Sequence, residues 1–292
     1  MNDRDEHSRL LSEHFSGLTA YWKDIYTSTV KRWDFFHQVA ARKRKEVVLD
    51  FVDRYARGRS MRILDSGCGA GVIMEELLRR GHRVYGIDIS PDMLRETAET
   101  LKEFQLDDTA LRVGSVEGLD FPDRSFDLSL CIGVLQYLED DELALKELAR
   151  VTKPGGQVII SLPNIARVTT LFDPYYYLRR LPHFIKHMIS RSLKRENRLT
   201  SRDIRKNDTF RNRRYYYGQL RGLFKGCGLE IRSVAPIGYG PLTFWEHEYF
   251  SREFTLRVSQ KIERLASRRG FSFLKAIADR WVMVLEKKDV SS

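Results

Sequence analysis

The sequence is poor in cysteine and has no long apolar segment. Its three cysteines among 292 residues, Cys68, Cys131 and Cys227, are too few for a disulfide framework and indicate a reducing compartment. No apolar run reaches the roughly 18 residues that a transmembrane helix needs. The polar start of the chain, Met1 to His7, lacks the apolar core of a signal peptide. These absences predict a cytoplasmic protein, and a 42% share of hydrophobic residues supplies a full core.

Positive charge is concentrated in one segment. The chain carries a net charge of +10, and residues 165–214 hold 14 Lys or Arg against 4 Asp or Glu, so this segment alone accounts for the excess. Apolar residues at helical spacing between 178 and 193 predict a basic amphipathic helix there. Such a block binds phosphates, an anionic membrane surface or an acidic substrate, or else forms a solvated surface insertion.

Short apolar runs and amphipathic segments alternate from residue 61 onward. The pattern predicts helices at 72–80, after Ser90-Pro91 and at Asp141–Val151, and strands at 61–64, 83–87, Leu111–Val113, Phe126–Ile132 and 157–162. Two late strands are predicted at 229–234 and 281–286. This order predicts an α/β fold with a doubly wound, mostly parallel sheet of the Rossmann-like kind.

The chain is predicted to comprise four segments. Residues 1–57, where Gly17 interrupts the first helical pattern, form an N-terminal helical cap, and residues 58–164 form a cofactor-binding core. Residues 165–214 form a basic helical insertion or lid after the fifth strand. Residues 215–292 complete the core with the late strands.

A glycine-rich turn follows the first predicted strand, in Arg62-Ile-Leu-Asp-Ser-Gly-Cys-Gly-Ala-Gly71. Its glycines let the backbone run close to a ligand, and the helix that follows presents free N–H groups. Asp88 stands seventeen residues after Gly71, at the end of Val84-Tyr-Gly-Ile-Asp88. An acid at the tip of that strand is placed to accept hydrogen bonds from a ribose, so the pair of segments predicts a nucleoside half-site.

A nicotinamide dinucleotide is the chief alternative ligand for this turn. Its fingerprint, G-x-G-x-x-G, is not met, because Val72 stands where the third glycine belongs. Asp65 directly precedes the turn, where it is a poor neighbour for a pyrophosphate and a good one for an ammonium group. The pattern therefore favours a nucleoside that carries a zwitterion.

Five stretches, taken together and in order, resemble the class I S-adenosylmethionine-dependent methyltransferases, in the small-molecule branch that includes the ubiquinone-biosynthesis methyltransferases. They are Leu64-Asp-Ser-Gly-Cys-Gly-Ala-Gly71, Gly86-Ile-Asp-Ile-Ser-Pro-Asp-Met-Leu94, Gly114-Ser-Val-Glu117 with Phe121-Pro-Asp-Arg-Ser-Phe-Asp127, Cys131-Ile-Gly-Val-Leu-Gln-Tyr-Leu138 and Arg150-Val-Thr-Lys-Pro-Gly-Gly156. They cover roughly a third of the chain. The resemblance does not extend to residues 165–214 or to the N-terminal helices.

The resemblance implies S-adenosyl-L-methionine as cofactor and gives each matching position a role. Asp65 and the glycine turn would hold the amino acid end, Asp88 the ribose hydroxyls, and Ile89 and Met93 the adenine. Arg44 or Arg42, before the first strand, would meet the ligand carboxylate. The implied cofactor-binding residues are Arg44, Asp65, Gly67, Cys68, Gly69, Gly71, Asp88, Ile89, Met93, Ser115, Val116, Glu117 and Ile132.

Methyl transfer to a hydroxyl requires alignment of the acceptor and a base for its proton. Related enzymes often place a histidine in the loop after the fourth strand, where this chain has Tyr137. With a pKa of about 10, a tyrosine is better suited to orient the acceptor, or simply packs under the loop. His247, in the aromatic stretch Phe244-Trp-Glu-His-Glu-Tyr-Phe250, is a candidate base or an interface packing residue.

Two further histidines, His183 and His187, share a helical face in the basic segment. No third ligand stands nearby, so they extend the basic face and no metal site is predicted.

The leading interpretation is a small-molecule methyltransferase with a lipophilic or anionic acceptor, with O-methylation favoured. The basic segment would bring it to an anionic membrane surface. An RNA-modifying enzyme that uses the same segment is one alternative, although the chain has no recognisable RNA-binding module. A non-catalytic cofactor-binding protein is the other.

Overall fold

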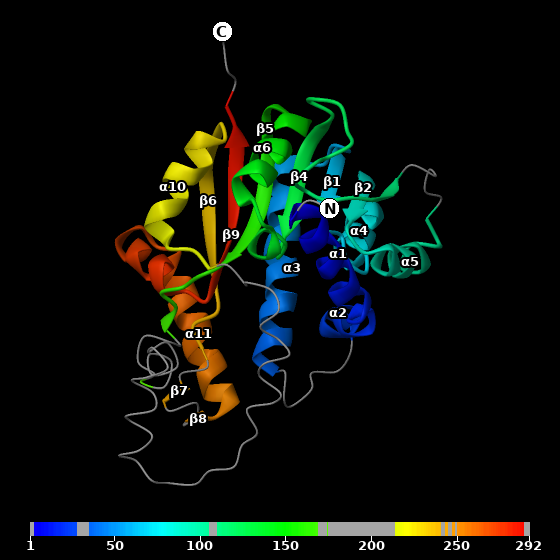
Figure 1. Cartoon of the computed structure of the whole chain (residues 1–292). Coiled ribbons are helices and arrows are strands. Elements are labelled where there is room, and N and C mark those ends of the chain that lie inside the picture. Colours follow the sequence, from blue (N-terminus) through cyan, green and yellow to red (C-terminus); the bar gives the residue numbers. More distant parts are fainter. Residues whose placement is uncertain are drawn as a thin grey trace.

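A seven-stranded sheet forms the centre of the molecule (Figure 1). The computed structural model describes residues 3–27, 35–104, 110–168, 174, 214–240, 243–244, 247–248 and 250–288. The predicted basic helix at 178–193, with His183 and His187, lies outside these residues. The strands are β1 (Arg62–Ser66), β2 (Arg83–Asp88), β3 (Leu111–Val113), β4 (Phe126–Ile132), β5 (Thr152–Pro163), β6 (Leu229–Ile237) and β9 (Arg280–Lys287).

The strand order is β3-β2-β1-β4-β5-β9-β6. The pairs among β3, β2, β1, β4 and β5 are all parallel, whereas β9 is antiparallel to both β5 and β6. The predicted doubly wound, mostly parallel sheet is therefore confirmed. The reversal of β9 has a consequence for the site, because this strand begins at the edge where its parallel neighbours end. Arg280, the first residue of β9, pairs with Pro163, the last residue of β5.

Helices cover both faces of the sheet (Figure 1). On one face, α3 (Phe35–Ala56) contacts β6 and β9, and α4 (Val72–Arg79) contacts β2. On the other face, α6 (Asp141–Val151) contacts β4 and β5, and α10 (Tyr217–Gly226) contacts β6. α5 (Pro91–Thr100) contacts β2 and β3. The described residues also form α11 (Arg252–Ala266), the 3-10 segments η2 (Leu135–Tyr137) and η4 (Arg269–Ile277), and the hairpin of β7 (Thr243–Phe244) with β8 (His247–Glu248).

The strands divide their apolar side chains between two cores because successive side chains point to opposite faces. In β5, Val158 and Ile160 belong to the core under α6 and α10, while Ile159 belongs to the core under α3 and α4. In β9, Met283 and Val282 divide in the same way. Burial on both faces explains why these strands read as continuous apolar runs in the sequence.

The N-terminal helices take two different positions. α1 (Asp3–Ser16) and α2 (Thr19–Thr27) both contact α5. Ser16 Oγ lies 2.8 Å from Ser90 Oγ at the start of α5, and Lys23 Nζ donates to Glu96 Oε1 at 2.5 Å. α3 instead packs on the face of the sheet. The segment predicted as one cap therefore contains a two-helix cover and a helix of the core.

Candidate functional site

A cavity of about 600 Å³ opens at the carboxyl ends of β1, β2 and β4. Its floor comes from the segments that follow these strands, and its cover comes from α1 and α2. Ligands of open α/β sheets bind at this edge, since the loops that leave parallel strands converge there. The cavity is therefore the candidate functional site.

The glycine turn after β1 needs its glycines for two physical reasons. Gly67, Gly69 and Gly71 all have positive φ, at +76°, +57° and +77°, a region that L side chains rarely adopt. A Cβ on Gly67 would lie 2.2 Å from Val134 Cγ2, in the loop after β4. The turn is fastened to β2, because Gly67 N donates to Ile87 O at 2.7 Å. It can therefore run directly beneath a ligand.

Asp88 ends β2, and its carboxylate accepts hydrogen bonds from two backbone N–H groups. Its Oδ2 accepts a hydrogen bond from Gly69 N at 3.0 Å, and its Oδ1 accepts one from Ser90 N at 2.9 Å. The side chain is 8% exposed, and burial raises its pKa while these bonds oppose the rise. Each oxygen retains acceptor capacity toward the cavity. A pair of vicinal hydroxyls is one ligand group from which such a fixed carboxylate can accept hydrogen bonds.

Asp65, in β1, is the second carboxylate of the cavity. It is 2% exposed, and its Oδ2 has no hydrogen-bond partner within the described part of the chain. Burial, followed by the nearby charge of Asp88, raises the pKa of Asp65 to about 7. A buried carboxylate oxygen without a partner is costly, and a cationic ligand group would compensate for it. The ammonium group of S-adenosylmethionine fits this requirement.

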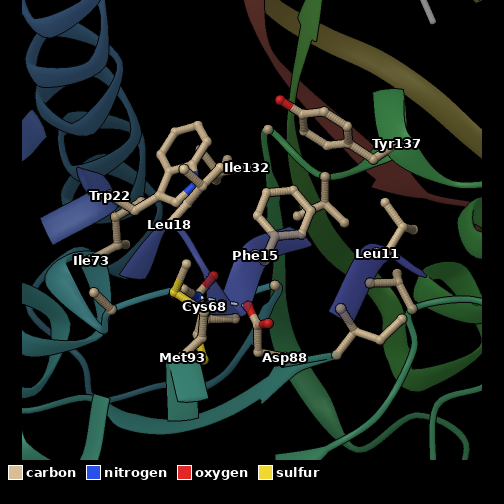
Figure 2. Close-up of a pocket in the computed structure, with 18 of the residues that line it drawn as sticks. Leu11, Phe15, Leu18, Trp22, Cys68, Ile73, Asp88, Met93, Ile132 and Tyr137 are labelled. Carbon is tan, nitrogen blue, oxygen red and sulfur yellow. Dashed lines mark hydrogen bonds between the residues drawn. The ribbon is translucent and has the colours of Figure 1, made fainter. Parts of the chain in front are cut away.

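Aromatic side chains from α1, α2 and η2 face the carboxylates across the cavity. Figure 2 shows the Phe15 ring between Tyr137 and Asp88, with Trp22 beside it. Phe15 and Tyr137 meet edge to face with centroids 5.2 Å apart, and Phe15 lies 6.3 Å from Trp22. Such a wall excludes water from the reacting groups and provides flat surfaces for an apolar or aromatic ligand.

Two arginines line the same part of the cavity. Arg44, from the middle of α3, is 5% exposed; its Nη2 donates to Tyr26 Oη at 2.6 Å, and its Nε has no partner among the described residues. A Cβ on Gly133, just after β4, would lie 3.0 Å from Arg44 Nη1. Arg280 begins β9 and is half-buried. Burial, followed by the charge of Arg44, lowers the pKa of Arg280 to about 10.

The structure brings most of the sequence-predicted cofactor residues together. The cavity is lined by eleven of the thirteen, namely Arg44, Asp65, Gly67, Cys68, Gly69, Asp88, Ile89, Met93, Ser115, Val116 and Ile132.

The other two predicted residues have contacts outside the cavity lining. A Cβ on Gly71 would lie 2.9 Å from Thr97 Cγ2, so this glycine permits α4 and α5 to approach. Glu117 Oε1 accepts a hydrogen bond from Asp140 N at 2.7 Å and so ties the loop after β3 to the start of α6.

Of the two predicted catalytic residues, only Tyr137 is found in the cavity lining that the structure describes. Tyr137 lines the cavity at the end of η2, and its carbonyl oxygen lies 2.9 Å from His7 Nε2. His247 belongs to β8, whose hairpin lies beside α11 in Figure 1, and its side chain lies outside what the structure describes. The assignment of His247 as a base stays a prediction.

Sequence reasoning missed several residues of the cavity. It gave Phe15 only to a helical pattern, and it gave Arg280 no role. Helical spacing shows that the aromatics share a face, but the position of that face over the cavity depends on how α1 and α2 pack on α5. Arg280 carries no local signal, because it reaches the cavity only through the antiparallel direction of β9.

Neither a metal site nor a membrane span is found in the described part of the molecule. Among those residues, no three His, Cys, Asp or Glu side chains gather closely enough to hold an ion. None of the described helices combines the length and the apolar character that a bilayer crossing requires.

Comparison with known proteins confirms the resemblance seen in the sequence. Residues 64–160 match the family described as a methyltransferase domain. A malonyl-[acyl-carrier protein] O-methyltransferase of Erwinia pyrifoliae is 34% identical over 152 residues, which are 49% of this chain and 56% of that protein. A ubiquinone biosynthesis O-methyltransferase of Alkalilimnicola ehrlichii is 37% identical over 139 residues, or 46% of this chain and 56% of that protein. The match thus spans little more than half the length of each relative.

Solved structures share the fold over nearly the whole chain. Magnesium protoporphyrin IX methyltransferase from Synechocystis PCC 6803, with bound S-adenosylmethionine, superposes with a TM-score of 0.60 at 13% identity, and covers 97% of each chain. A methyltransferase from Burkholderia thailandensis that acts on 1,6-didemethyltoxoflavin superposes with a TM-score of 0.56 at 16% identity, over 99% of this chain and 92% of that one. At such low identity these likenesses establish the fold alone.

Proposed function

We propose that this chain, whose residues 64–160 match the family described as a methyltransferase domain, is a class I S-adenosylmethionine-dependent enzyme that transfers a methyl group from that cofactor to a small acceptor. The observation that carries the proposal is the cavity itself, which holds Asp65, Asp88 and the glycine turn on one side and the aromatic wall on the other. When bound, the cofactor supplies an electrophilic methyl group on its sulfonium.

The cofactor would be held by groups that need its particular charges. Asp88, fixed by Gly69 N and Ser90 N, would accept hydrogen bonds from both ribose hydroxyls. The unpartnered Oδ2 of Asp65 would accept one from the ammonium group, and the unpartnered Nε of Arg44 would donate to the carboxylate. Asp65 and Arg44 thus offer the negative and the positive group that a zwitterionic amino acid end requires.

The rest of the cavity would orient the acceptor and exclude water. Alignment of donor and acceptor contributes up to roughly 7–11 kcal/mol in favourable cases, and the protein achieves it by positioning alone. Phe15 and Trp22 would cover the reacting groups, and Tyr137 would orient the acceptor through its hydroxyl. His247 remains the proposed base for a hydroxyl acceptor.

We propose oxygen as the atom methylated and a lipophilic or anionic molecule as acceptor. The two curated relatives described above are named as O-methyltransferases, which supports oxygen. The aromatic side of the cavity supports an apolar body, and the arginines that line it support a negative charge.

Calorimetric titration with S-adenosylhomocysteine, the demethylated product of the cofactor, tests the proposal first. We expect micromolar affinity, about −8 kcal/mol. Incubation of the protein with cofactor labelled in its methyl group and with host extract should then yield one labelled small molecule. Absence of S-adenosylhomocysteine binding overturns the proposal, while binding without any labelled product leaves only the non-catalytic alternative.

The basic segment at 165–214 is proposed to bring the enzyme to an anionic membrane surface. Co-sedimentation with anionic vesicles at low salt, and release at high salt, is the expected result. Neutral vesicles provide the control. Salt-sensitive binding of RNA, with no binding of vesicles, would instead support the RNA-modifying alternative.

A further inference from the structure

The cavity has acidic residues on one side and basic residues on the other, and the proposed cofactor pairs with only some of these charges. Asp65 and Asp88 lie at the ends of β1 and β2, on the cofactor side. Arg44 lies over Gly133 at the end of β4, and Arg280 lies two strands farther along the sheet, at the start of β9. If Arg44 meets the carboxylate of the cofactor, Arg280 is a second cation with no anion assigned to it.

The described surroundings of Arg280 neutralise its charge only in part: the charge of Asp279 raises the pKa of Arg280, but by less than burial and Arg44 lower it. Arg280 has neither a hydrogen bond nor an ion pair to its side chain within the described residues. Asp279 is adjacent in sequence, but its Oδ2 accepts from Gly240 N at 3.3 Å and lies 2.8 Å from the position of a Cβ on Gly238. The other charged or titratable groups that act on Arg280 are Arg44, Tyr137 and Tyr26.

Burial of two like charges in one cavity is unfavourable in the absence of a ligand. Burial, and after it the charge of Arg44, destabilises the charged form of Arg280 and lowers its pKa. An arginine remains charged near neutral pH even so, because its pKa stays far above 7. Its planar fork of donors matches a carboxylate or a phosphate, which makes such an anion the natural compensating partner.

We propose that Arg280 forms an anion subsite that binds a carboxylate or phosphate group of the acceptor. This inference rests on the proposed function, since it takes the acceptor to share the cavity with the cofactor. Arg280 lines the same cavity as the rings of Phe15 and Tyr137. The acceptor class is therefore an apolar or aromatic molecule that carries an anionic group. Arg280 acts as a specificity-determining residue that orients this molecule through its charge.

Matched ligand pairs test the subsite without knowledge of the natural acceptor. The probes are benzoate, phenyl phosphate and the neutral benzamide, with octanoate and octanamide as an alkyl pair. Each is titrated by calorimetry into the protein both with and without excess S-adenosylhomocysteine. We expect at least one anion of each body type to bind about tenfold more tightly than its amide. A preference for benzoate over phenyl phosphate, or the reverse, identifies which anion the subsite takes.

Three variants separate the charge of Arg280 from its contribution to the fold. Arg280→Gln should bring the anions to the affinity of the amides, while Arg280→Lys keeps a large part of the preference. Arg83→Gln removes an exposed arginine from the start of β2, at the opposite edge of the sheet, and should leave the preference intact. Thermal melting of each variant confirms that it is folded.

The outcomes distinguish this inference from the proposed function. Equal binding of anions and amides, no binding of any anion up to about 10 mM, or an unchanged preference in Arg280→Gln overturns the subsite. A loss of S-adenosylhomocysteine affinity in Arg280→Gln, with the anion preference retained, assigns Arg280 to the cofactor and also overturns it. Failure of the wild-type protein to bind S-adenosylhomocysteine, with the anion preference present, overturns only the proposed function.

Discussion

The two sides of the cavity differ in how they are built. The acidic side, with Asp65, Asp88 and the glycine turn, comes from 24 consecutive residues and is held by backbone hydrogen bonds. The aromatic and basic side is assembled from α1, α2, α3, η2 and the start of β9, which lie far apart in the sequence. A local half thus faces an assembled half. Under the proposed function the local half holds the ribose and the ammonium group of the cofactor, and the assembled half, apart from Arg44, serves the acceptor.

The largest expected effect concerns the point where the two halves touch. Gly67→Ala places a Cβ 2.2 Å from Val134 Cγ2 at a φ of +76°. The overlap and the unfavourable φ together should cost roughly 2–5 kcal/mol of unfolding free energy. Denaturant unfolding measures it. Gly58→Ala is the control, since its φ is +80° and nothing lies within 4 Å of its Cβ position. Equal losses in both variants would show that contact between the halves is unimportant.

Asp65→Asn should stabilise the protein without ligand and weaken its binding of cofactor. Because burial raises the pKa of Asp65 from 3.8 to about 7, the stability that the folded wild type gains from protonation is full below about pH 4 and is lost as pH rises to 7. Asp65→Asn has no carboxyl to ionise, so its unfolding free energy should not fall in this way. The difference in unfolding free energy between variant and wild type should therefore grow from pH 4 to 7 and reach at most about 4 kcal/mol above pH 7.

Unfolding curves at several pH values measure this difference. Asp123→Asn, an exposed acid in an ion pair with Arg150, is the control and should show no such gain with pH. If the gain in unfolding free energy of Asp65→Asn over the wild type becomes smaller toward high pH, the inference that burial destabilises the ionised form of Asp65 is contradicted.

Asp88→Asn should weaken S-adenosylhomocysteine binding by about 100-fold, or roughly 3 kcal/mol. An amide nitrogen would face a backbone donor, either Gly69 N or Ser90 N, and one charge-assisted acceptor would be lost. Calorimetric titration measures the affinity. Asp92→Asn changes an acid four residues farther along that pairs with Arg95, and should have no effect. Similar affinities in Asp88→Asn and the wild type would show that Asp88 does not bind the ribose.

The smallest expected effect lies on the assembled side. Tyr137→Phe keeps the ring contact with Phe15 and removes only the hydroxyl, so S-adenosylhomocysteine affinity should change less than about twofold. Methyl transfer to the labelled product should fall several-fold. Tyr216→Phe, at an exposed position before α10, is the control. A loss of cofactor affinity in Tyr137→Phe would show that the division between the halves is wrong.

This division also explains how much of the molecule was predictable. The strands, the glycine turn and Asp88 follow from local patterns, because each signal lies within a single β-α-β unit. Gly71 and Glu117 match the same pattern, yet the structure shows them in contact with Thr97 and Asp140. A motif thus marks the turn without separating ligand contacts from packing contacts.

In the assembled half, Arg44 and Tyr137 were predicted as site residues, but the place of Arg280 and of α3 escaped prediction for topological reasons. Arg280 reaches the cavity because β9 runs against its neighbours, and a strand pattern carries no information about direction. α3 was expected in the cap but packs on the sheet, because Val48 and Val52 complete the core under it. Tertiary packing decides both positions.

Ser90 links the cofactor side of the cavity to its cover. Its backbone N–H holds Asp88 Oδ1, and its hydroxyl lies 2.8 Å from that of Ser16 at the end of α1. The carboxylate proposed to hold the ribose and the helix that covers the cavity are therefore both tied to one residue outside the cavity lining. If the ribose of the cofactor binds Asp88 as proposed, loss of this hydroxyl pair should loosen α1 and shorten the residence time of the spent cofactor.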